Sequence, residues 1–190
     1  TLLRQFNPSD GAASIRWFPL NEFPAHIKEY VIAAEDRRFY YHPGFDPLAI
    51  ARASVQNMRA MEIVSGGSTI TQQAARMVYA EILPRNIILK KFCEIIFAVK
   101  LELHFTKDEI LEVYLNRVPM KFNQQGLPAA SVRIFGRDIR FISRAESAAL
   151  VILIRRNQAS VDMFRERFVI FLKKNNLIQD RKQVLDILLE

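Results

Sequence analysis

The chain has 190 residues, half of them hydrophobic, with only six glycines and eight prolines. This length and composition predict one folded domain with a sizeable core and exclude a disordered chain. The formal net charge of +7 favours an anionic partner: a nucleic acid, an acidic membrane surface or a phosphorylated substrate.

The ends of the sequence suggest a larger protein. No run of 18 apolar residues occurs, so the chain itself is not predicted to span a membrane. It shows no signal-peptide pattern and begins at Thr1 rather than Met. We therefore expect a piece of a longer protein, with any membrane anchor upstream of residue 1.

The first part of the chain reads as an irregular lead-in followed by two helices. Proline and glycine interrupt residues 1–22, so no regular element is predicted there. A helix is predicted over 24–38, because a proline suits its first turn and one face is apolar. The turn sequence HPGFDP at 42–47 separates it from a second helix over 47–61.

The middle of the chain predicts two more helices. The turn SGGS at 65–68 precedes a helix that Thr69 or Thr71 could cap and that reaches about Glu81. Residues 87–105 have the spacing of a long amphipathic helix with a wet opposite face; its apolar residues are Ile88, Phe92, Ile95, Ile96, Val99 and Leu103.

Two capping boxes mark later helices. Thr106 to Glu109 opens a helix that ends near Asn116, and Ser143 to Glu146 leads into a helix over 148–154. Short helices are predicted near 162–174 and 179–189. Since no repeat, strand-rich region or linker is visible, residues 23–190 are predicted to form a single, mostly α-helical domain.

Glu35 is the most informative single residue. It lies at the edge of the apolar face of its helix, where a carboxylate is partly desolvated and becomes a better proton acceptor near neutral pH. The alternative is a surface glutamate paired with Arg38 or Lys28.

The GGST turn is the second feature. Its glycines allow close approach of a ligand, and the following helix N-terminus offers N–H groups to an anion. It matches neither a Walker loop nor a dinucleotide fingerprint. The alternative is a plain turn before a capped helix. Side chains that could donate to a ligand here are Ser68, Thr69, Gln72, Gln73 and Arg76.

The sequence KKFCE at 90–94 places two lysines on one helix face with Glu94. Lys90 and Lys91 could receive a diphosphate, and Glu94 could orient them or hold a metal ion. Arg85 could join this cluster. An ordinary surface ion pair is the alternative.

The remaining reactive residues predict little chemistry. His26, His42 and His104 do not match metal-ligand spacing, and His42 is expected to brace a turn. Cys93 is expected to pack, and as the single cysteine it cannot form an internal disulfide. The aromatic residues follow core spacing rather than the basic residues, so nucleic acid is not an expected partner.

Four motifs stand in order: EDRRFYYHPGFD at 35–46, GGSTITQQ at 66–73, KKFCE at 90–94 and KDEILEVYLN at 107–116. With the stretches at 128–138 and 143–153, the chain resembles the peptidoglycan glycosyltransferase domain of class A penicillin-binding proteins and monofunctional transglycosylases. The resemblance covers about residues 23–160.

This resemblance implies a lysozyme-like, mostly α fold on the outer (periplasmic or extracellular) face of the bacterial cytoplasmic membrane. Such domains polymerise lipid II into β-1,4-linked glycan strands with inversion and release of undecaprenyl diphosphate. Glu35 matches the general base, and Glu94 the glutamate that supports the diphosphate. No cofactor is implied beyond a possible divalent cation such as Mg²⁺ or Mn²⁺.

The resemblance also extends to substrate and membrane contacts. The residues expected to bind substrate are Asp36, Gly67, Ser68, Thr69, Gln72, Gln73, Arg76, Arg85, Lys90, Lys91 and Asn116. A further apolar set lies where the family has a membrane-dipping segment, with simple core as the equal alternative: Phe45, Leu48, Ile50, Val55, Met58, Met61, Ile63 and Val64.

Some positions depart from the family pattern. Arg76 stands where Lys is usual, and Arg85 is one residue out of register, with Asn86 in its place. The loops at 117–126 and 154–160 also differ. These departures leave open a silent module that binds lipid II or acts as a scaffold. A lysozyme-like hydrolase is a further rival, which the phosphate-suited basic cluster disfavours.

Overall fold

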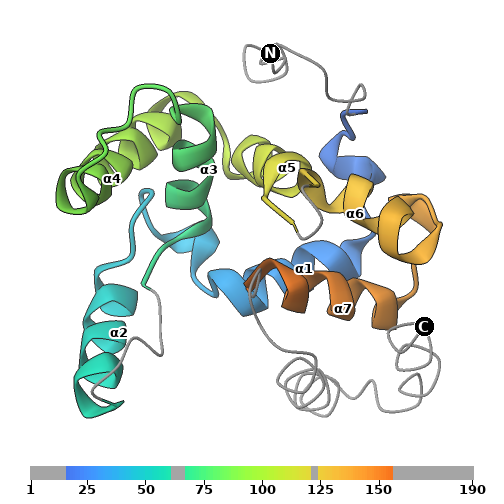
Figure 1. Cartoon of the computed structure of the whole chain (residues 1–190), viewed down its shortest axis with the longest axis horizontal. Helices are drawn as coiled ribbons and strands as arrows, with labels where there is room; N and C mark the ends of the chain where they lie inside the picture. Colours follow the sequence, from blue (N-terminus) through green and yellow to red (C-terminus); the bar gives the residue numbers. More distant parts are fainter. Residues whose placement is uncertain (1–15, 61–66, 121–123, 156–190) are drawn as a thin grey trace. The chain divides into compact units, whose positions relative to one another are not determined.

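The computed structural model describes residues 16–60, 67–120 and 124–155, and Figure 1 shows these parts as helices and connecting turns. Internal contacts divide the chain into two compact units. Of the described residues, 35–60 and 67–114 form the central unit, and 16–34, 115–120 and 124–155 form the flanking unit. Within the described ranges the regular structure is helical, apart from an isolated bridge between Pro119 and Gln125, as the apolar spacing predicts. The extent of a single domain stays a prediction.

The flanking unit contains most of α1 (Ala25–Glu35), the end of α5 (Lys107–Arg117), α6 (Gly126–Phe135) and α7 (Arg144–Arg155). Two short 3-10 turns, η2 (Leu20–Glu22) and η4 (Ile139–Phe141), also belong to this unit. Apolar side chains from all these elements are buried, which gives the unit its own core: Phe18, Phe23, Ile27, Val31, Leu115, Leu127, Ile139, Ala148 and Leu150.

Asn116 fastens two distant segments of the flanking unit. Its side-chain oxygen accepts from the Phe18 N–H at 2.9 Å, and its Nδ2 donates to the Phe18 carbonyl at 2.8 Å. Both residues are buried. The amide therefore satisfies the buried N–H and carbonyl of Phe18, which belong to two successive peptide groups.

The central unit contains η3 (Phe39–Tyr41), α2 (Pro47–Ala60), α3 (Ile70–Val78), α4 (Ile87–His104) and most of α5. Helix α3 packs along α4 (Figure 1), and Tyr79 stacks on Phe97 with ring centroids 4.4 Å apart. The buried apolar residues of this unit include Phe39, Ile70, Ala74, Ala75, Val78, Ala98, Leu101, Ile110, Leu111 and Tyr114.

The two later capping boxes are confirmed. Thr106 N–H and Glu109 N–H are each bound by the other residue's side chain, at 2.9 and 3.3 Å. Ser143 and Glu146 make the same reciprocal pair at 2.6 and 3.2 Å. These pairs close helix ends with residues only three apart, which explains why the sequence reveals them.

Several boundaries differ from the predictions. Helix α1 ends at Glu35 rather than Arg38, since the following residues form a turn and then η3. Helix α6 was not predicted because Gly126 and Pro128 at its start are typical of turns, although proline fits the first turn of a helix. The predicted helices at 162–174 and 179–189 lie outside the described residues.

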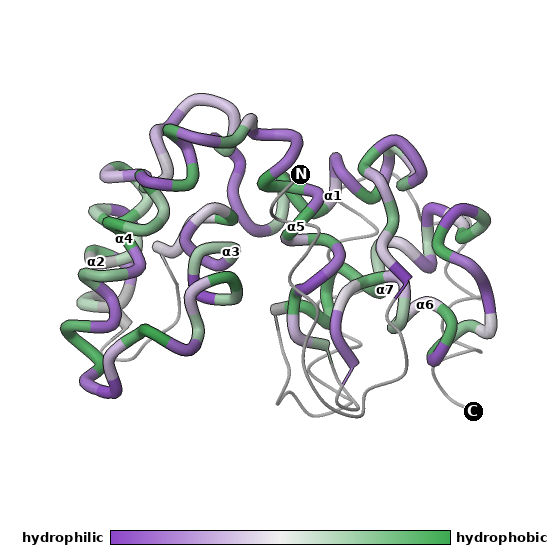
Figure 2. The backbone as a smooth tube through the Cα atoms, turned by 90° about the horizontal axis from the view of Figure 1, so that it is seen from above, coloured by the Kyte–Doolittle hydropathy of each residue, from purple (hydrophilic) through white to green (hydrophobic). Residues whose placement is uncertain are grey.

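The predicted orientation of α4 is wrong. Its buried residues are Glu94, Ala98 and Leu101, whereas the apolar set that the spacing singled out is largely exposed: Ile88, Phe92, Ile96 and Leu103. Figure 2 shows hydrophobic residues recurring along α4. The helix packs through Glu94, Ala98 and Leu101, so its periodic apolar face points outward.

Helix α2 also exposes apolar side chains. Leu48, Ile50, Val55 and Met58 are exposed, which argues against simple core for these four. Phe45 is half-buried, and positions 61, 63 and 64 lie outside the described residues. Contact of this segment with a membrane stays a prediction.

Replacing Asn116 with alanine tests its structural role. Asn116→Ala leaves the buried Phe18 N–H and carbonyl without the amide, so the free energy of unfolding is expected to fall by about 2–4 kcal/mol. Urea unfolding measures this change. Asn21→Ala, at an exposed position of the same unit, is the control and should stay within about 0.5 kcal/mol of the parent. A similarly small effect of Asn116→Ala would contradict the structural role.

Candidate active site

The N-terminus of α3 organises the central unit. Thr69 is its N-cap: the Thr69 hydroxyl accepts from the Gln72 N–H at 3.1 Å, and Gln72 Oε1 accepts from the Thr69 N–H at 3.2 Å. The next N–H group, that of Ile70, donates to Asp36 Oδ2 at 3.0 Å. The expectation that this terminus offers these N–H groups to an anion is therefore wrong, because protein side chains already bind them.

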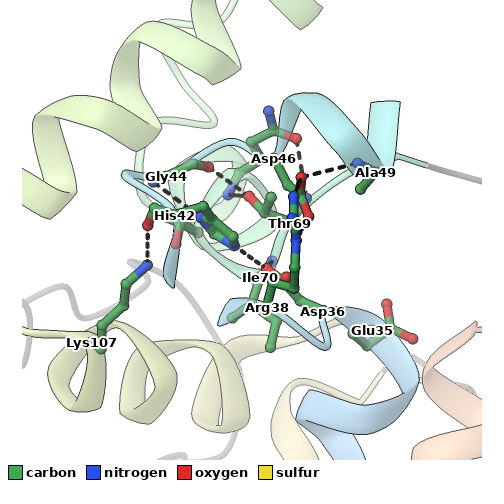
Figure 3. Close-up of polar contacts among 12 residues, drawn as sticks. Glu35, Asp36, Arg38, His42, Gly44, Asp46, Ala49, Thr69, Ile70 and Lys107 are labelled. Atoms are coloured by element: carbon green, nitrogen blue, oxygen red, sulfur yellow. Dashed lines mark hydrogen bonds and ion pairs between the residues drawn. The ribbon is translucent and has the colours of Figure 1, made fainter. Parts of the chain in front are cut away.

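Asp36 links α3 to the loop that follows α1 (Figure 3). Besides Ile70 N–H, its Oδ2 lies 2.8 Å from His42 Nε2. His42 Nδ1 accepts from the Gly44 N–H at 3.2 Å, so Nε2 carries the proton that is donated to Asp36. The prediction that His42 braces a turn is confirmed.

Gly44 allows this loop to lie directly against α4. Its φ is +95°, and a Cβ here would fall 2.8 Å from the backbone of Ala98, so a larger residue would push the loop from the helix. The Gly44 carbonyl accepts from the Thr69 hydroxyl at 2.6 Å. Lys107 Nζ donates to the His42 carbonyl at 2.7 Å, which holds the loop from the other side.

Asp46 closes the same loop and caps α2. It accepts from Arg38 Nε at 2.9 Å, from Arg38 Nη2, and from the Ala49 N–H at 2.9 Å. The hydrogen bond with Arg38 is the main cause that lowers the pKa of this carboxyl to about 2. Arg38 is thus committed to Asp46, and the alternative that Arg38 pairs with Glu35 is not realised.

Glu35 is the last residue of α1 and contacts α3 instead. Its Oε2 accepts from Gln73 Nε2 at 3.1 Å, and its Oε1 is shielded from solvent. Gln73 Oε1 lies 3.5 Å from the Tyr114 hydroxyl on α5, which fixes the orientation of the amide. Figure 3 shows the Glu35 carboxylate directed away from the Asp36 network.

Glu94 forms a second cluster, on the buried face of α4. Arg76 Nε and Nη2 donate to its two oxygens at 2.6 and 3.1 Å, in a bidentate pair. Lys91 Nζ donates to Glu94 Oε2 at 3.2 Å and to the Ser68 hydroxyl at 2.7 Å. Four of the predicted site residues are thereby brought together.

The charge state of this cluster follows from its contacts. Burial would raise the pKa of the Glu94 carboxyl, but the hydrogen bonds and charges of Arg76 and Lys91 outweigh burial and lower it. Glu94 is therefore ionised at neutral pH and is not a proton donor. Arg76 and Lys91 are partly exposed, so two cations and one carboxylate present a net positive charge to an anionic group.

Helix α3 contacts both Glu35 and the Glu94 cluster. Gln73 binds Glu35 and Arg76 binds Glu94, and positions three apart lie on one face of a helix. The cap at Thr69 sets where these side chains point. One rigid element thus carries the contacts of both carboxylates.

Some predicted site residues have structural partners instead. Asp36 is buried in the loop network, and Asn116 is bound to Phe18. A Cβ on Gly67 would fall 2.9 Å from Ile50 Cα, so this glycine serves close packing against α2. Within the described residues, Lys90 and Arg85 make no polar contact with Glu94. Substrate binding stays a prediction for these five positions and for the other predicted site residues.

One polar connection was not predicted from the sequence. Glu102 Oε1 accepts from the Thr71 hydroxyl and from Lys107 Nζ, both at 2.6 Å, and so joins α3, α4 and α5. Lys107 also lies 4.7 Å from the centre of the Phe39 ring. Lys107 is the first residue of the KDEILEVYLN motif, and this position is the sequence signal that could have pointed to its contact with Glu102.

The donor set does not favour a divalent cation. Among the described residues, no three His, Cys, Asp or Glu side chains are grouped to hold a metal ion. Both oxygens of Glu94 already accept from Arg76 and Lys91, and a dication would have to displace them. These surroundings suit an anion.

Comparison with known proteins supports a glycosyltransferase. The transglycosylase family model matches residues 2–187. Penicillin-binding protein 1A of Aquifex aeolicus is 38% identical over 134 residues, which are 70% of this chain and 18% of that protein. Penicillin-binding protein 1A of Neisseria gonorrhoeae is 38% identical over 131 residues (69% and 16%). Penicillin-binding protein 1F of Bacillus subtilis is 37% identical over 131 residues (69% and 18%). The matched segments span less than a fifth of these relatives.

The helical fold and the family match define a lysozyme-like glycosyltransferase domain. The chain belongs to the transglycosylase family. This membership confirms the predicted fold class, the enzyme class and the link to peptidoglycan synthesis. Across residues 16–60, 67–120 and 124–155, no helix has the length and apolar content needed to cross a bilayer.

Asp46→Asn tests the loop beside the site. The pKa of Asp46 lies below its ordinary value of 3.8, at about 2, so its pairing stabilises the fold above about pH 4 and is lost as pH falls through 2. The substitution should lower the free energy of unfolding by about 2 kcal/mol at pH 7, and this deficit should shrink towards pH 2. Urea unfolding across pH measures it. Asp108→Asn, an exposed carboxylate, is the control; equal effects of both would contradict the assignment.

Proposed function

We propose that this domain polymerises lipid II, with Glu35 as general base and the Glu94 cluster as the site for the diphosphate of the donor. The carrying observation is that one helix, α3, contacts both carboxylates, through Gln73 and Arg76. Glu35 accepts from the neutral amide of Gln73, and Glu94 accepts from two cations, Arg76 and Lys91.

In the proposed step, Glu35 takes the proton from the 4-hydroxyl of the acceptor N-acetylglucosamine. That oxygen attacks the anomeric carbon of the donor N-acetylmuramic acid, and the bond from this carbon to the diphosphate breaks with its electron pair. Attack opposite the leaving group inverts the anomeric centre and gives a β-1,4 link. The Gln73 amide holds one oxygen of Glu35, which supports a fixed orientation for proton transfer.

The leaving group explains why the second glutamate need not be an acid. A diphosphate leaves as an anion, so its developing charge can be met by cations rather than by a proton. Arg76 and Lys91 supply these cations, and Ser68 adds a hydroxyl beside Lys91. Glu94, ionised and buried, holds the arginine and the lysine in position.

The proposed partners follow from this substrate. Lipid II and undecaprenyl diphosphate are membrane lipids, so the domain would work at the outer face of the bacterial cytoplasmic membrane. The net charge of +7 suits an anionic lipid surface. The growing glycan strand would be the other substrate.

Glu35→Gln tests the base. The amide cannot take a proton, so polymerisation of purified lipid II should fall at least a hundredfold, while lipid II binding stays largely intact. Products are resolved by gel, and binding is measured separately. Glu29→Gln, at an exposed position of the same helix, should retain parental activity.

The outcomes separate the base from a silent module and from a hydrolase. Near-normal turnover by Glu35→Gln would overturn the base assignment. Binding of lipid II without glycan from the unaltered chain would favour the silent module, and release of sugars from finished glycan would favour the hydrolase.

Lys91→Ala tests the diphosphate site. Loss of a charge-assisted contact should raise the KM for lipid II about tenfold or more, with thermal stability little changed. Steady-state kinetics in detergent measures this effect. Arg52→Ala removes the same charge from an exposed position of α2 and serves as the control. Unchanged kinetics for Lys91→Ala would remove this lysine from the site.

A further inference from the structure

Tyr114 is a buried tyrosine of α5 whose hydroxyl group reaches the contacts of Glu35. Its side chain is enclosed in the core of the central unit, and its hydroxyl lies 3.5 Å from Gln73 Oε1. This distance is at the long end of a hydrogen bond, and such contacts in an active site commonly tighten when substrate binds. Because the ring is enclosed, Tyr114 itself does not touch a substrate.

Gln73 stands between Tyr114 and Glu35. Its Nε2 donates to Glu35 Oε2 at 3.1 Å, and its backbone N–H donates to the Thr69 carbonyl at 3.1 Å, in the capped first turn of α3. The backbone of Gln73 is therefore fixed, and rotation of its amide is the freedom that remains. Helices α1, α3 and α5 supply one residue each to this series of contacts, and all three residues belong to the central unit.

The two ends of the Gln73 amide are similar in size but opposite in hydrogen-bonding character, because one is an NH2 donor and the other an oxygen acceptor. A half-turn of the amide would fit the same space, but it would bring the amide oxygen against the carboxylate of Glu35. Two acceptors repel each other unless Glu35 carries a proton. The orientation with the NH2 group toward Glu35 therefore suits the ionised carboxylate, which is the form that a general base needs.

The Tyr114 hydroxyl stabilises this orientation. It donates to the oxygen at one end of the Gln73 amide, while the NH2 group at the other end donates to Glu35. Without the hydroxyl, Gln73 Oε1 would lose this donor and face an apolar ring. The observed orientation would then lose stability relative to the turned one.

We propose that Tyr114 is a positioning residue for the general base. Its hydroxyl holds the Gln73 amide with the NH2 group toward Glu35, and the amide holds the carboxylate in one orientation for proton transfer. This inference rests on the proposed role of Glu35. Because a small misplacement of a base slows proton transfer, loss of the hydroxyl slows the chemical step. Lipid II binding is unaffected, since Tyr114 contacts no substrate.

Tyr114→Phe removes the hydroxyl and keeps the buried ring. With purified lipid II in detergent, kcat is expected to fall about tenfold, while KM stays within about twofold of the parental value. Tyr40→Phe is the matched control, because it removes a phenolic hydroxyl that binds Asp108 at 3.1 Å in the same unit. This control should keep the parental kcat. Thermal unfolding followed by circular dichroism shows that each variant is folded.

A double-mutant cycle separates positioning from a general loss of stability. Gln73→Met has nearly the length of glutamine but no amide. If Tyr114 acts through Gln73, adding Tyr114→Phe to Gln73→Met should change kcat by less than about twofold. A further fall as large as the one in the parent background would overturn the proposal.

Hydrogen exchange of the side-chain amide tests the contact without turnover. The NMR signals of the Gln73 amide are identified by their absence from Gln73→Met. Their exchange with solvent should be about tenfold faster in Tyr114→Phe than in the parent, and unchanged in Tyr40→Phe. Parental exchange in Tyr114→Phe would overturn the proposal.

Comparison with Glu35→Gln distinguishes failure of this inference from failure of the proposed function. Retained turnover in Glu35→Gln would contradict the base assignment and the positioning role together. An inactive Glu35→Gln beside a Tyr114→Phe variant with parental kcat would overturn the positioning role alone. In that case a lower thermal stability of Tyr114→Phe would assign the hydroxyl to the core.

Discussion

The capture of the Ile70 N–H by Asp36 is the contact on which the central unit depends. Asp36 is itself held by His42, and Thr69 and Gln72 close the rest of the helix end. Because a helix is rigid, fixing its first turn also fixes side chains one and two turns later. Gln73 and Arg76 thereby reach Glu35 and Glu94 from a single element. The glycine-rich turn thus helps to place α3, and its binding of a ligand stays a prediction.

The two glutamates show how surroundings divide one residue type between two tasks. Glu94 is buried, yet it stays charged because Arg76 and Lys91 contribute more than burial removes. Glu35 accepts a hydrogen bond from the neutral amide of Gln73. The proposed proton acceptor and the carboxylate that anchors two cations therefore lie in the same unit.

Local features were predictable from the sequence, whereas contacts between distant residues were not. The capping boxes at Thr106 and Ser143 join residues three apart, so their pattern is visible in the letters. The helical spacing of apolar residues in α4 could also be recognised in the sequence. This spacing alone does not determine which face of the helix packs against a neighbouring helix. Its packing through Ala98 and Glu94 reversed the expected orientation. The link from Thr71 through Glu102 to Lys107 spans three helices, and no local rule predicts it.

The arginine at position 76 has an energetic consequence of its own. Its planar fork spans both oxygens of Glu94, which a single ammonium group could not do with the same two parallel hydrogen bonds. The guanidinium is thus ordered while the protein folds. Immobilising a long, flexible side chain during binding costs conformational entropy and would otherwise weaken the binding of an anionic ligand. Preorganisation of this kind moves an entropic penalty from each round of association to the single event of folding.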